Sequence, residues 1–381
     1  IVIQIHANMN AESDFKAGLG YRRRILGVLH LMVLSVMISY GQTDSTDQGT
    51  DKQDHPRRYL SLFEDDDLLE VSLLFDVSSF LKKADRNQSL DGTLTMHFSP
   101  TDSLESKVTV KYRGQSRYER CRFPPARITF KKPIYEVSDS GKIKKMKLVN
   151  QCQSGPSYEN YIIREYLVYK LYGVLTDTSF RVRLVKLNLL DSEKKRKPAT
   201  QYGIFIEPEE LLETRLKITE VKTEALSQRH MYPSLIDQVA IFNYMVSNWD
   251  WSVPGQHNVS VFTSSQPGYA GMGIPVPFDF DLTGVVNADY AIPPPDMSIE
   301  TNRERLFSGI CRTREVYHSE LLDFLGKKGE FYAVINDSPF LSNMAKKDIS
   351  SFLDQFFDQL EKPRSRDNLI DTFLGTCKDF K

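Results

Sequence analysis

The sequence predicts an α+β fold with two lobes, in which a β-rich first lobe carries one inserted helix and the second lobe is mainly helical. Short runs rich in β-branched and aromatic residues, separated by turn residues, predict strands in the first lobe. These strands are expected at residues 68–77, 92–98, 107–114, 126–132 and 145–149. In the second lobe, apolar residues recur every three or four positions at 235–248 and 347–362, which predicts helices. The lobes are expected to span residues 59–207 and 208–381.

The inserted helix is predicted at residues 156–175, between the fifth strand and the remaining strands of the first lobe. It begins with a proline, which favours the first helical turn, and Gly173 lies near its end. Two more strands are expected after it, at 179–190 and 201–207. The chain then enters the helical lobe, whose first long helix ends just before the most informative motif of the sequence.

Residues 1–41 have the features of a signal peptide. Three arginines at 22–24 precede an apolar run at 25–40, which has about the length of a signal-peptide core and is too short to span a bilayer comfortably. Small residues follow, so cleavage is expected before Gln42, and a membrane anchor is the alternative. Residues 42–58 are polar and predict a disordered linker. The mature protein is expected to be secreted, or to reside in the periplasm or cell envelope, with no stable membrane span.

Cysteine usage and charge narrow the classes of function. The cysteines are Cys121, Cys152, Cys311 and Cys377. Export to an oxidising compartment predicts one or two disulfides among them, and four buried free thiols are the alternative. The pairing cannot be read from the sequence, and no pair has the spacing of zinc ligands. Basic and acidic side chains nearly balance, at 49 and 50, and no basic patch is interleaved with aromatic residues, which argues against nucleic-acid binding.

Acidic and amide side chains recur at short spacing in residues 248–284. Asp250 lies in a tight loop, Asn258 follows, and a Gly-rich turn then leads to a strand that ends in two aspartates. Phosphoryl transfer needs an acid that accepts the proton of the attacking hydroxyl, and oxygen ligands that hold Mg²⁺. Asp250 is therefore predicted as the catalytic residue, and the predicted metal ligands are Asn258, Asp279 and Asp281. The alternative is an ordinary turn followed by an edge strand.

A cation that binds the phosphates of a nucleotide is expected in the first lobe. Lys147 lies on the last strand before the inserted helix, and Glu165 lies among apolar residues in the middle of that helix. A buried carboxylate is costly unless it is paired, so these two residues are predicted to form an ion pair. Arg127 on the preceding strand is the rival cation, and the alternative is that all three side chains face solvent. The polar segment 113–117 could bring backbone amides and arginines to a phosphate, or could be a β-turn with exposed arginines.

Several motifs within residues 107–284 together resemble one family. The chain contains, in order, RGQSR, FPPARITFKK, KMKLV, YLVYKLYG, QYGIFIE, NWD, HN and PFDFDLTG. This order is similar to that of the CotH spore-coat kinase family. The Asn-x-Asp, His-Asn and Asp arrangement also resembles HipA-type and secretory casein-kinase-like atypical kinases.

The resemblance implies a bilobed protein-kinase-like fold that uses ATP and Mg²⁺. It implies Asp250 as the catalytic residue, with Asn258 and either Asp279 or Asp281 at the metal positions. A protein Ser, Thr or Tyr hydroxyl would accept the phosphate. The family's basic run is replaced by Phe-Pro-Pro at 123–125, so the resemblance does not fix the cation that anchors ATP.

An exported kinase meets little ATP outside the cytoplasm, so two other classes of function stay open. The protein could be a catalytically inactive kinase-like protein, or a carbohydrate- or metal-binding protein of the cell envelope, without phosphotransfer. It could also be a structural or interaction protein, in which case Asp250→Ala would cost only about 1 kcal/mol of stability. Mg²⁺-dependent ATP binding that is lost in Asp279→Ala would distinguish the kinase.

Overall fold

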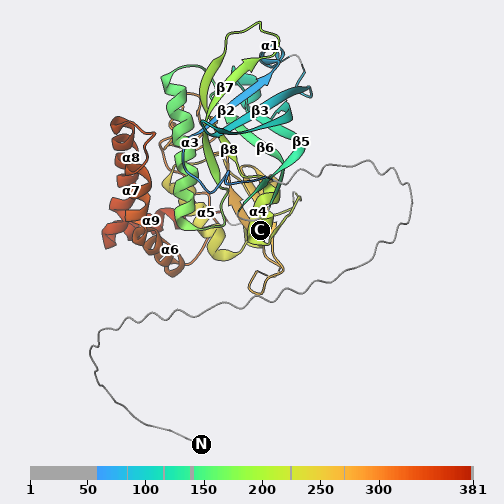
Figure 1. Cartoon of the computed structure of the whole chain (residues 1–381). Helices are drawn as coiled ribbons and strands as arrows, with labels where there is room; N and C mark the ends of the chain where they lie inside the picture. The colour runs from blue at the N-terminus through green and yellow to red at the C-terminus, as the bar shows by residue number, and fades with distance from the viewer. Residues whose placement is uncertain are drawn as a thin grey trace, which may run out of the picture. The chain divides into compact units, whose positions relative to one another are not determined.

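The first half of the chain forms a closed β-barrel in the computed structural model of the protein (Figure 1). The structure describes residues 58–83, 85–114, 116–137, 141–223, 225–269 and 271–378. These residues belong to one compact unit, residues 56–381. The predicted signal peptide lies outside the described residues, as does all but the last residue of the predicted linker.

Strands predominate in the first part of the described chain, and helices predominate in the last part. The strands are β1 (Tyr59–Leu60), β2 (Leu69–Phe75), β3 (Ser89–Ser99), β4 (Asp102–Tyr112), β5 (Ala126–Glu136), β6 (Lys142–Asn150), β7 (Val182–Asp191), β8 (Ala199–Ile206), β9 (Thr219–Glu220), β10 (Val259–Thr263) and β11 (Ile274–Pro277). The helices are α1 (Val77–Lys82), α2 (Ser116–Arg120), α3 (Pro156–Leu175), α4 (Glu209–Leu216), α5 (Pro233–Met245), α6 (Arg314–Gly326), α7 (Lys328–Asn336), α8 (Asn343–Glu361) and α9 (Pro363–Thr376). Two short 3₁₀ helices are η1 (Gln228–His230) and η2 (Pro254–Gln256).

Each barrel strand pairs with two neighbours, in the order β5, β4, β3, β2, β7, β8, β6 and back to β5. These pairings are antiparallel except that of β2 with β7, which is parallel. In β2, Val71, Leu73 and Phe75 are buried and alternate with more exposed residues, because successive side chains of a strand point to opposite faces. The buried face fills the interior of the barrel. Outside it, β1 pairs with β5, and β11, β10 and β9 form a separate sheet.

The predicted bilobed protein-kinase-like fold is wrong, because the strands close into a mixed seven-stranded barrel. Closure results from β6, which pairs on one edge with β5 and on the other with β8. The parallel contact of β2 with β7 then joins strands that precede α3 to strands that follow it. Alternation along a strand tells which side chains face inward but not which strands are neighbours, so the sequence pattern could not distinguish an open sheet from a barrel.

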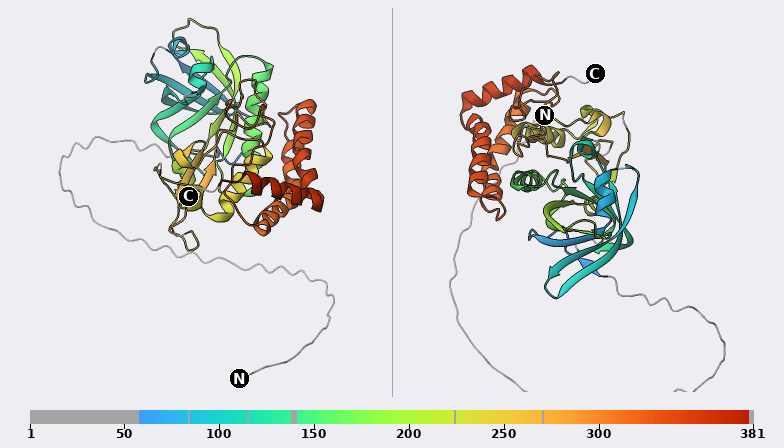
Figure 2. Two further views of the ribbon diagram at one scale, coloured as in Figure 1. Left: turned by 180° about the vertical axis from the view of Figure 1, so that it is seen from behind. Right: turned by 90° about the horizontal axis from the view of Figure 1, so that it is seen from above.

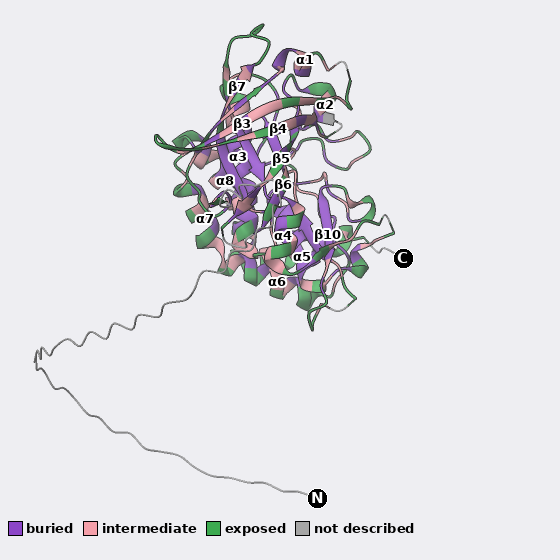
Figure 3. Cartoon of the chain, turned by 45° about the vertical axis from the view of Figure 1, so that its right-hand side comes forward, coloured by how far each residue is buried: buried purple, intermediate pink, exposed green. Residues whose placement is uncertain are grey.

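Helix α3 lies between the barrel and the C-terminal helices (Figure 2). One side of it packs on β7 and β8, and the other side contacts α7. Its buried residues, such as Leu171, join a second apolar core with Phe242 of α5 and Phe352 of α8. Figure 3 shows buried residues both in the barrel strands and around α3.

Two disulfides, Cys121–Cys152 and Cys311–Cys377, confirm the prediction that one or two would form. They fit a secreted protein, since disulfides persist in oxidising compartments. Within the described part of the chain, no helix is both long enough and apolar enough to cross a membrane.

Candidate functional site

The loop between α5 and β10 carries Asp250 and folds back on itself. The Asp250 N–H donates to Asn248 Oδ1 at 3.1 Å, the local turn that Asn favours. Ser252 and His257 exchange two backbone hydrogen bonds of 2.9 Å, which close the loop. Asn258 then adopts a left-handed backbone with φ of 54°, which Asn tolerates better than most residues. The loop thereby brings the side chains of Asp250, His257 and Asn258 together.

Both carboxylate oxygens of Asp250 have a partner. His257 Nε2 lies 2.7 Å from Oδ1, and Asn258 Nδ2 donates to Oδ2 at 2.9 Å. Asn258 Nδ2 also donates to the backbone oxygen of Asp250 at 2.7 Å. The hydrogen bond to Asp250 raises the pKa of His257, because it stabilises the protonated imidazole. Asp250 is therefore held in one orientation while it stays partly accessible.

The two aspartates after β11 lie on either side of a buried anchor. Phe280 is fully buried, and its ring packs edge-on against Tyr169 of α3 at 4.8 Å and Phe242 of α5 at 5.9 Å. Asp279 has φ of 61°, and its N–H donates to Tyr169 Oη at 2.8 Å. This backbone position costs energy for a residue with a side chain, so the surrounding structure must hold it. Asp279 and Asp281 are thus fixed relative to α3.

Arg117 of α2 binds three carboxylates at once. Its Nε donates to Asp281 Oδ2 at 2.7 Å, and its Nη2 donates to Asp279 Oδ1 at 3.0 Å. The same Nη2 lies 3.2 Å from Glu165 Oε2. Sequence reasoning missed this role, and its only signal was the polar segment 113–117. The partners of Arg117 lie on α3 and after β11, so no local spacing in the sequence could reveal them.

The buried carboxyl groups of the cluster have shifted pKa values. The pKa of Glu165 is raised to about 8, because burial and the charges of Asp281 and Asp279 outweigh the opposing effect of Arg117. Burial also raises the pKa of Asp281. Glu165 Oε1 is buried and has no hydrogen-bond partner within the described residues. A buried carboxylate oxygen without a partner is costly, so the cluster has room for another positive group.

Cations converge on Asp279 from several elements. Burial alone would raise its pKa, but Arg117, Arg113, Lys147 and His257 lower it below the usual value. The charge of Asp250 in turn raises the pKa of Asp281, which places the loop after α5 within electrostatic range of the same cluster. The loop that carries Asp250 and Asn258 therefore lies near the segment that carries Asp279 and Asp281.

The predicted ion pair between Lys147 and Glu165 is not formed. Lys147 Nζ instead lies 2.5 Å from Glu209 Oε1, and its ammonium lies 4.7 Å from the centroid of the Phe278 ring. The reason is the barrel register, in which Lys147 of β6 faces Ile206 of β8. Glu209 follows Ile206 closely in the chain and reaches Lys147, whereas Glu165 of α3 faces Arg117.

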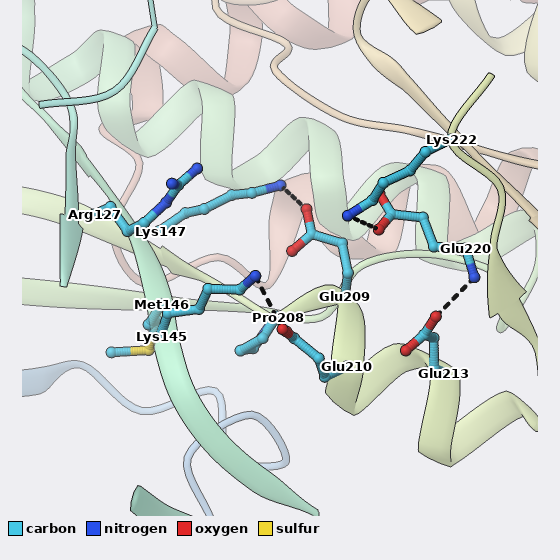
Figure 4. Close-up of a pocket in the computed structure, with 10 residues that line it drawn as sticks. All are labelled: Arg127, Lys145, Met146, Lys147, Pro208, Glu209, Glu210, Glu213, Glu220 and Lys222. Atoms are coloured by element: carbon cyan, nitrogen blue, oxygen red, sulfur yellow. Dashed lines mark hydrogen bonds and ion pairs between the residues drawn. The ribbon is translucent and has the colours of Figure 1, made fainter. Parts of the chain in front are cut away.

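A cavity of about 550 Å³ opens beside Lys147 (Figure 4). It is lined by Arg127, Lys145, Met146, Lys147, Pro208, Glu209, Glu210, Glu213, Glu220 and Lys222. Arg127 faces Lys147 across the β5–β6 pair, and both side chains point the same way in Figure 4. Among the described residues, no ion-pair partner of Arg127 occurs within 4 Å. Lys147 thus connects the cavity with the carboxylate cluster, since its charge also lowers the pKa of Asp279.

The site offers oxygen donors of the kind that Mg²⁺ prefers. The Phe278 N–H donates to the backbone oxygen of Asn258 at 2.9 Å, which sets Asn258 next to Asp279. Within the described parts of the chain, no three Asp, Glu, His or Cys side chains are arranged to hold a metal ion by themselves. Mg²⁺ is commonly bound by one or two carboxylates together with water and substrate phosphates. Asn258, Asp279 and Asp281 supply oxygen atoms of this kind.

Comparisons with known proteins identify no relative. No protein-family model matches the chain, and no curated protein sequence matches it. The function is therefore inferred from the geometry of the site.

Proposed function

We propose that this protein is an exported, CotH-like phosphotransferase that moves the γ-phosphoryl group of ATP to a protein hydroxyl with Mg²⁺ bound. The observation that carries this proposal is the position of Asp250. Its carboxylate is oriented by His257 and Asn258 and lies within electrostatic range of a buried cluster in which carboxylates and cations meet. The phosphoryl-transfer reaction needs such a juxtaposition of a proton acceptor, charge-neutralising cations and metal-binding oxygens.

Asp250 would accept the proton of the acceptor hydroxyl. Its carboxylate is oriented by Asn258, which donates to Oδ2, and by His257, whose pKa is raised by the hydrogen bond to Asp250. The hydroxyl oxygen would form a bond to the γ-phosphorus as the bond from that phosphorus to the β–γ bridging oxygen breaks. The proton passes to Asp250, and ADP leaves. The backbone turn at Asn248 and the left-handed Asn258 hold the base in place for this transfer.

Arg113, Arg117 and Lys147 would bind the phosphates. They come from the end of β4, from α2 and from β6, and each lowers the pKa of Asp279, so their charges converge on one point. Arg127 and Lys147 face the cavity of about 550 Å³, a size typical of small-molecule sites. The nucleotide would occupy this cavity, with its phosphates directed past Lys147 toward Asp279.

Asn258, Asp279 and Asp281 would hold Mg²⁺, with either aspartate able to act as the principal ligand. A Mg²⁺ ion held by these residues would supply positive charge that neutralises the charge developing on the phosphates. Asp279 is the more accessible of the two, with a side chain 30% exposed against 7% for Asp281. Arg117 already bonds one oxygen of each, so it orients both carboxylates.

Export is part of the proposal. The two disulfides support it, as does the signal-peptide pattern in residues 1–41. The acceptor would then be a secreted or cell-envelope protein, and ATP would have to be supplied in that compartment.

The decisive test uses the secreted chain from residue 42 onward with its disulfides formed. Its thermal midpoint is measured with ATP, with and without Mg²⁺, and ADP release is measured in the presence of a mixture of secreted proteins. We expect a Mg²⁺-dependent rise in the midpoint, since a ligand that binds only the native state stabilises it. Asp279→Asn should abolish the rise in the thermal midpoint. Asp250→Asn should keep the rise but stop ADP release. Asp323→Asn, at an exposed position of α6, serves as the matched control.

Two results would contradict the proposal. If the protein is well folded but ATP does not raise its thermal midpoint in the presence of Mg²⁺, the protein has no nucleotide site. Stabilisation by the divalent metal alone would instead favour a catalytically inactive, metal- or carbohydrate-binding protein of the cell envelope.

A further inference from the structure

A disulfide joins the segment that carries Arg117 to the segment that leads into α3. Cys121 lies one helical turn after Arg117, and its N–H donates to the Arg117 carbonyl oxygen at 2.9 Å. Cys121 is bonded to Cys152, which lies in the connection between β6 and α3. Glu165, a partner of Arg117, lies on that helix. The disulfide therefore links the backbone beside Arg117 to the backbone that leads into α3, the helix that carries Glu165.

Further hydrogen bonds surround this disulfide. The Phe123 N–H donates to the Cys152 carbonyl oxygen at 3.2 Å, and Asn150 Nδ2 donates to the Pro124 carbonyl oxygen at 2.9 Å. Cys121 is 1% exposed and Cys152 is 7% exposed. The bond is thus an internal tie between two segments, in contrast to a surface disulfide that could open without disturbing its neighbours.

Helix α2 needs such a tie. It has five residues, and a helix of that length is not stable by itself in water. Yet its Arg117 side chain is only 8% exposed and bonds three carboxylates. The ion pairs of a buried arginine depend on a fixed backbone position, because a small displacement breaks several charge-assisted hydrogen bonds at once.

We propose that the Cys121–Cys152 disulfide is a positioning element of the phosphate-binding site. It would hold Arg117, and with it the nearby Arg113, where their charges meet the phosphates of ATP. This inference rests on the proposed function. It has a consequence for the cell: the chain would bind ATP tightly only after oxidation, so the site would assemble in the oxidising compartment and not before export.

The second disulfide provides a built-in control. Cys311–Cys377 joins residues 66 apart, against 31 for Cys121–Cys152, and ties the end of α9 to the segment before α6. A disulfide that closes a longer loop restricts the unfolded chain at least as much. Loss of either bond should therefore lower stability, but only loss of Cys121–Cys152 should disturb the site.

The experiment compares two double variants of the secreted chain, Cys121→Ser with Cys152→Ser and Cys311→Ser with Cys377→Ser. Thermal midpoints are measured, together with the dissociation constants of ATP and of adenosine in the presence of Mg²⁺. Both double variants should have lower midpoints. Only the first should bind ATP at least about tenfold more weakly, because charge-assisted bonds to phosphate are lost, while its adenosine affinity stays unchanged. Arg117→Gln should reproduce this pattern, and Arg117→Lys should restore part of the ATP affinity.

The possible outcomes separate this inference from the proposed function. Parent protein that does not bind ATP would overturn the proposed function. Parent protein that binds ATP, with equal weakening in both double variants or none in the first, would overturn the positioning role. If the first double variant does not fold, Arg117→Lys, which keeps the buried positive charge, decides: ATP affinity unchanged in Arg117→Lys would overturn the inference.

Discussion

Arg117 and Glu165, 48 residues apart in the sequence, form an ion pair whose side chains are only 8% and 1% exposed. Such a pair is costly to desolvate and is tolerated only when further hydrogen bonds satisfy both groups. Arg117 finds them in Asp279 and Asp281, whereas one oxygen of Glu165 has no hydrogen-bond partner among the residues that the structure describes. The pair therefore joins α2, α3 and the segment after β11 into one charged unit.

Removal of this guanidinium should strongly destabilise the protein. Arg117→Met would leave three carboxyl groups close together in a buried position, and breaking a buried pair from one side typically costs about 3–5 kcal/mol. We expect a loss of that size in the free energy of unfolding, measured by urea denaturation at pH 7.

The control for this prediction is Arg314→Met. Arg314 pairs with Asp371, but the two side chains are 45% and 63% exposed. An exposed pair contributes at most about 1 kcal/mol. Similar losses in both variants would show that the Arg117 cluster is not buried as described.

The close packing of the barrel can be tested at Gly203 of β8. A Cβ at this position would lie 3.0 Å from the Val149 carbonyl oxygen and 3.3 Å from Val185 Cγ2, on the two neighbouring strands. Gly203→Ala should therefore lower the free energy of unfolding by about 1–3 kcal/mol through overpacking. In α9, Gly375 has open space around it, so Gly375→Ala should be neutral or stabilising by up to about 1 kcal/mol. Equal effects of the two substitutions in urea denaturation would argue against a closed barrel at β6, β8 and β7.

The elements of the fold were predictable because their signals are local. Helix α3 was predicted at residues 156–175 and occupies Pro156–Leu175, since a proline starts it and buried residues fill its middle turns. The strand predicted at 126–132 begins where β5 (Ala126–Glu136) begins. Their arrangement was not predictable, because β6 gains its second partner, β8, only after the chain has passed through α3 and β7.

The same distinction applies to the candidate site. Asp250 and Asn258 are eight residues apart, and a tight loop brings them into hydrogen-bond contact, as a local pattern can indicate. Arg117 meets Asp281 across 164 residues, a contact that depends on how the barrel and α3 pack. Lys147 was predicted to pair with Glu165 from burial arguments, but the strand register places it next to Glu209, with which it forms an ion pair. Contacts set by packing between distant elements were therefore the ones that sequence reasoning missed.

Stability should depend on pH through Glu136 at the end of β5. Its side chain is fully buried and accepts hydrogen bonds from the Leu62 N–H at 3.1 Å and the Phe63 N–H at 3.5 Å. Burial raises its pKa to about 7, although those N–H groups oppose the shift. Because the folded pKa lies above the unfolded value, its stabilising contribution is complete below about pH 4.5 and is lost as the pH rises through about 7.

Glu136→Gln removes this titration. Between pH 5 and pH 8, the parent should lose about 2–3 kcal/mol more stability than the variant, from the size of the pKa shift. The measurement is a series of urea unfolding curves across this pH range. Other buried acids, such as Glu165 and Glu320, titrate in both proteins and cancel in the comparison. Parallel pH profiles would contradict the prediction.

Two neighbouring lysines of β6 allow a matched test of the nucleotide cavity. The Lys147 side chain is 12% exposed and pairs with Glu209, whereas Lys145 is 44% exposed and pairs with Glu210. Of these two lysines, Lys147 is the one whose charge is among those that lower the pKa of Asp279, so its charge should reach the phosphates. Lys147→Met should weaken Mg²⁺-dependent ATP binding by about tenfold or more, equivalent to about 1.4 kcal/mol, while Lys145→Met should change it little. Isothermal titration calorimetry measures the ATP affinity of both variants. Equal losses of affinity would show that the phosphates do not bind near the carboxylate cluster.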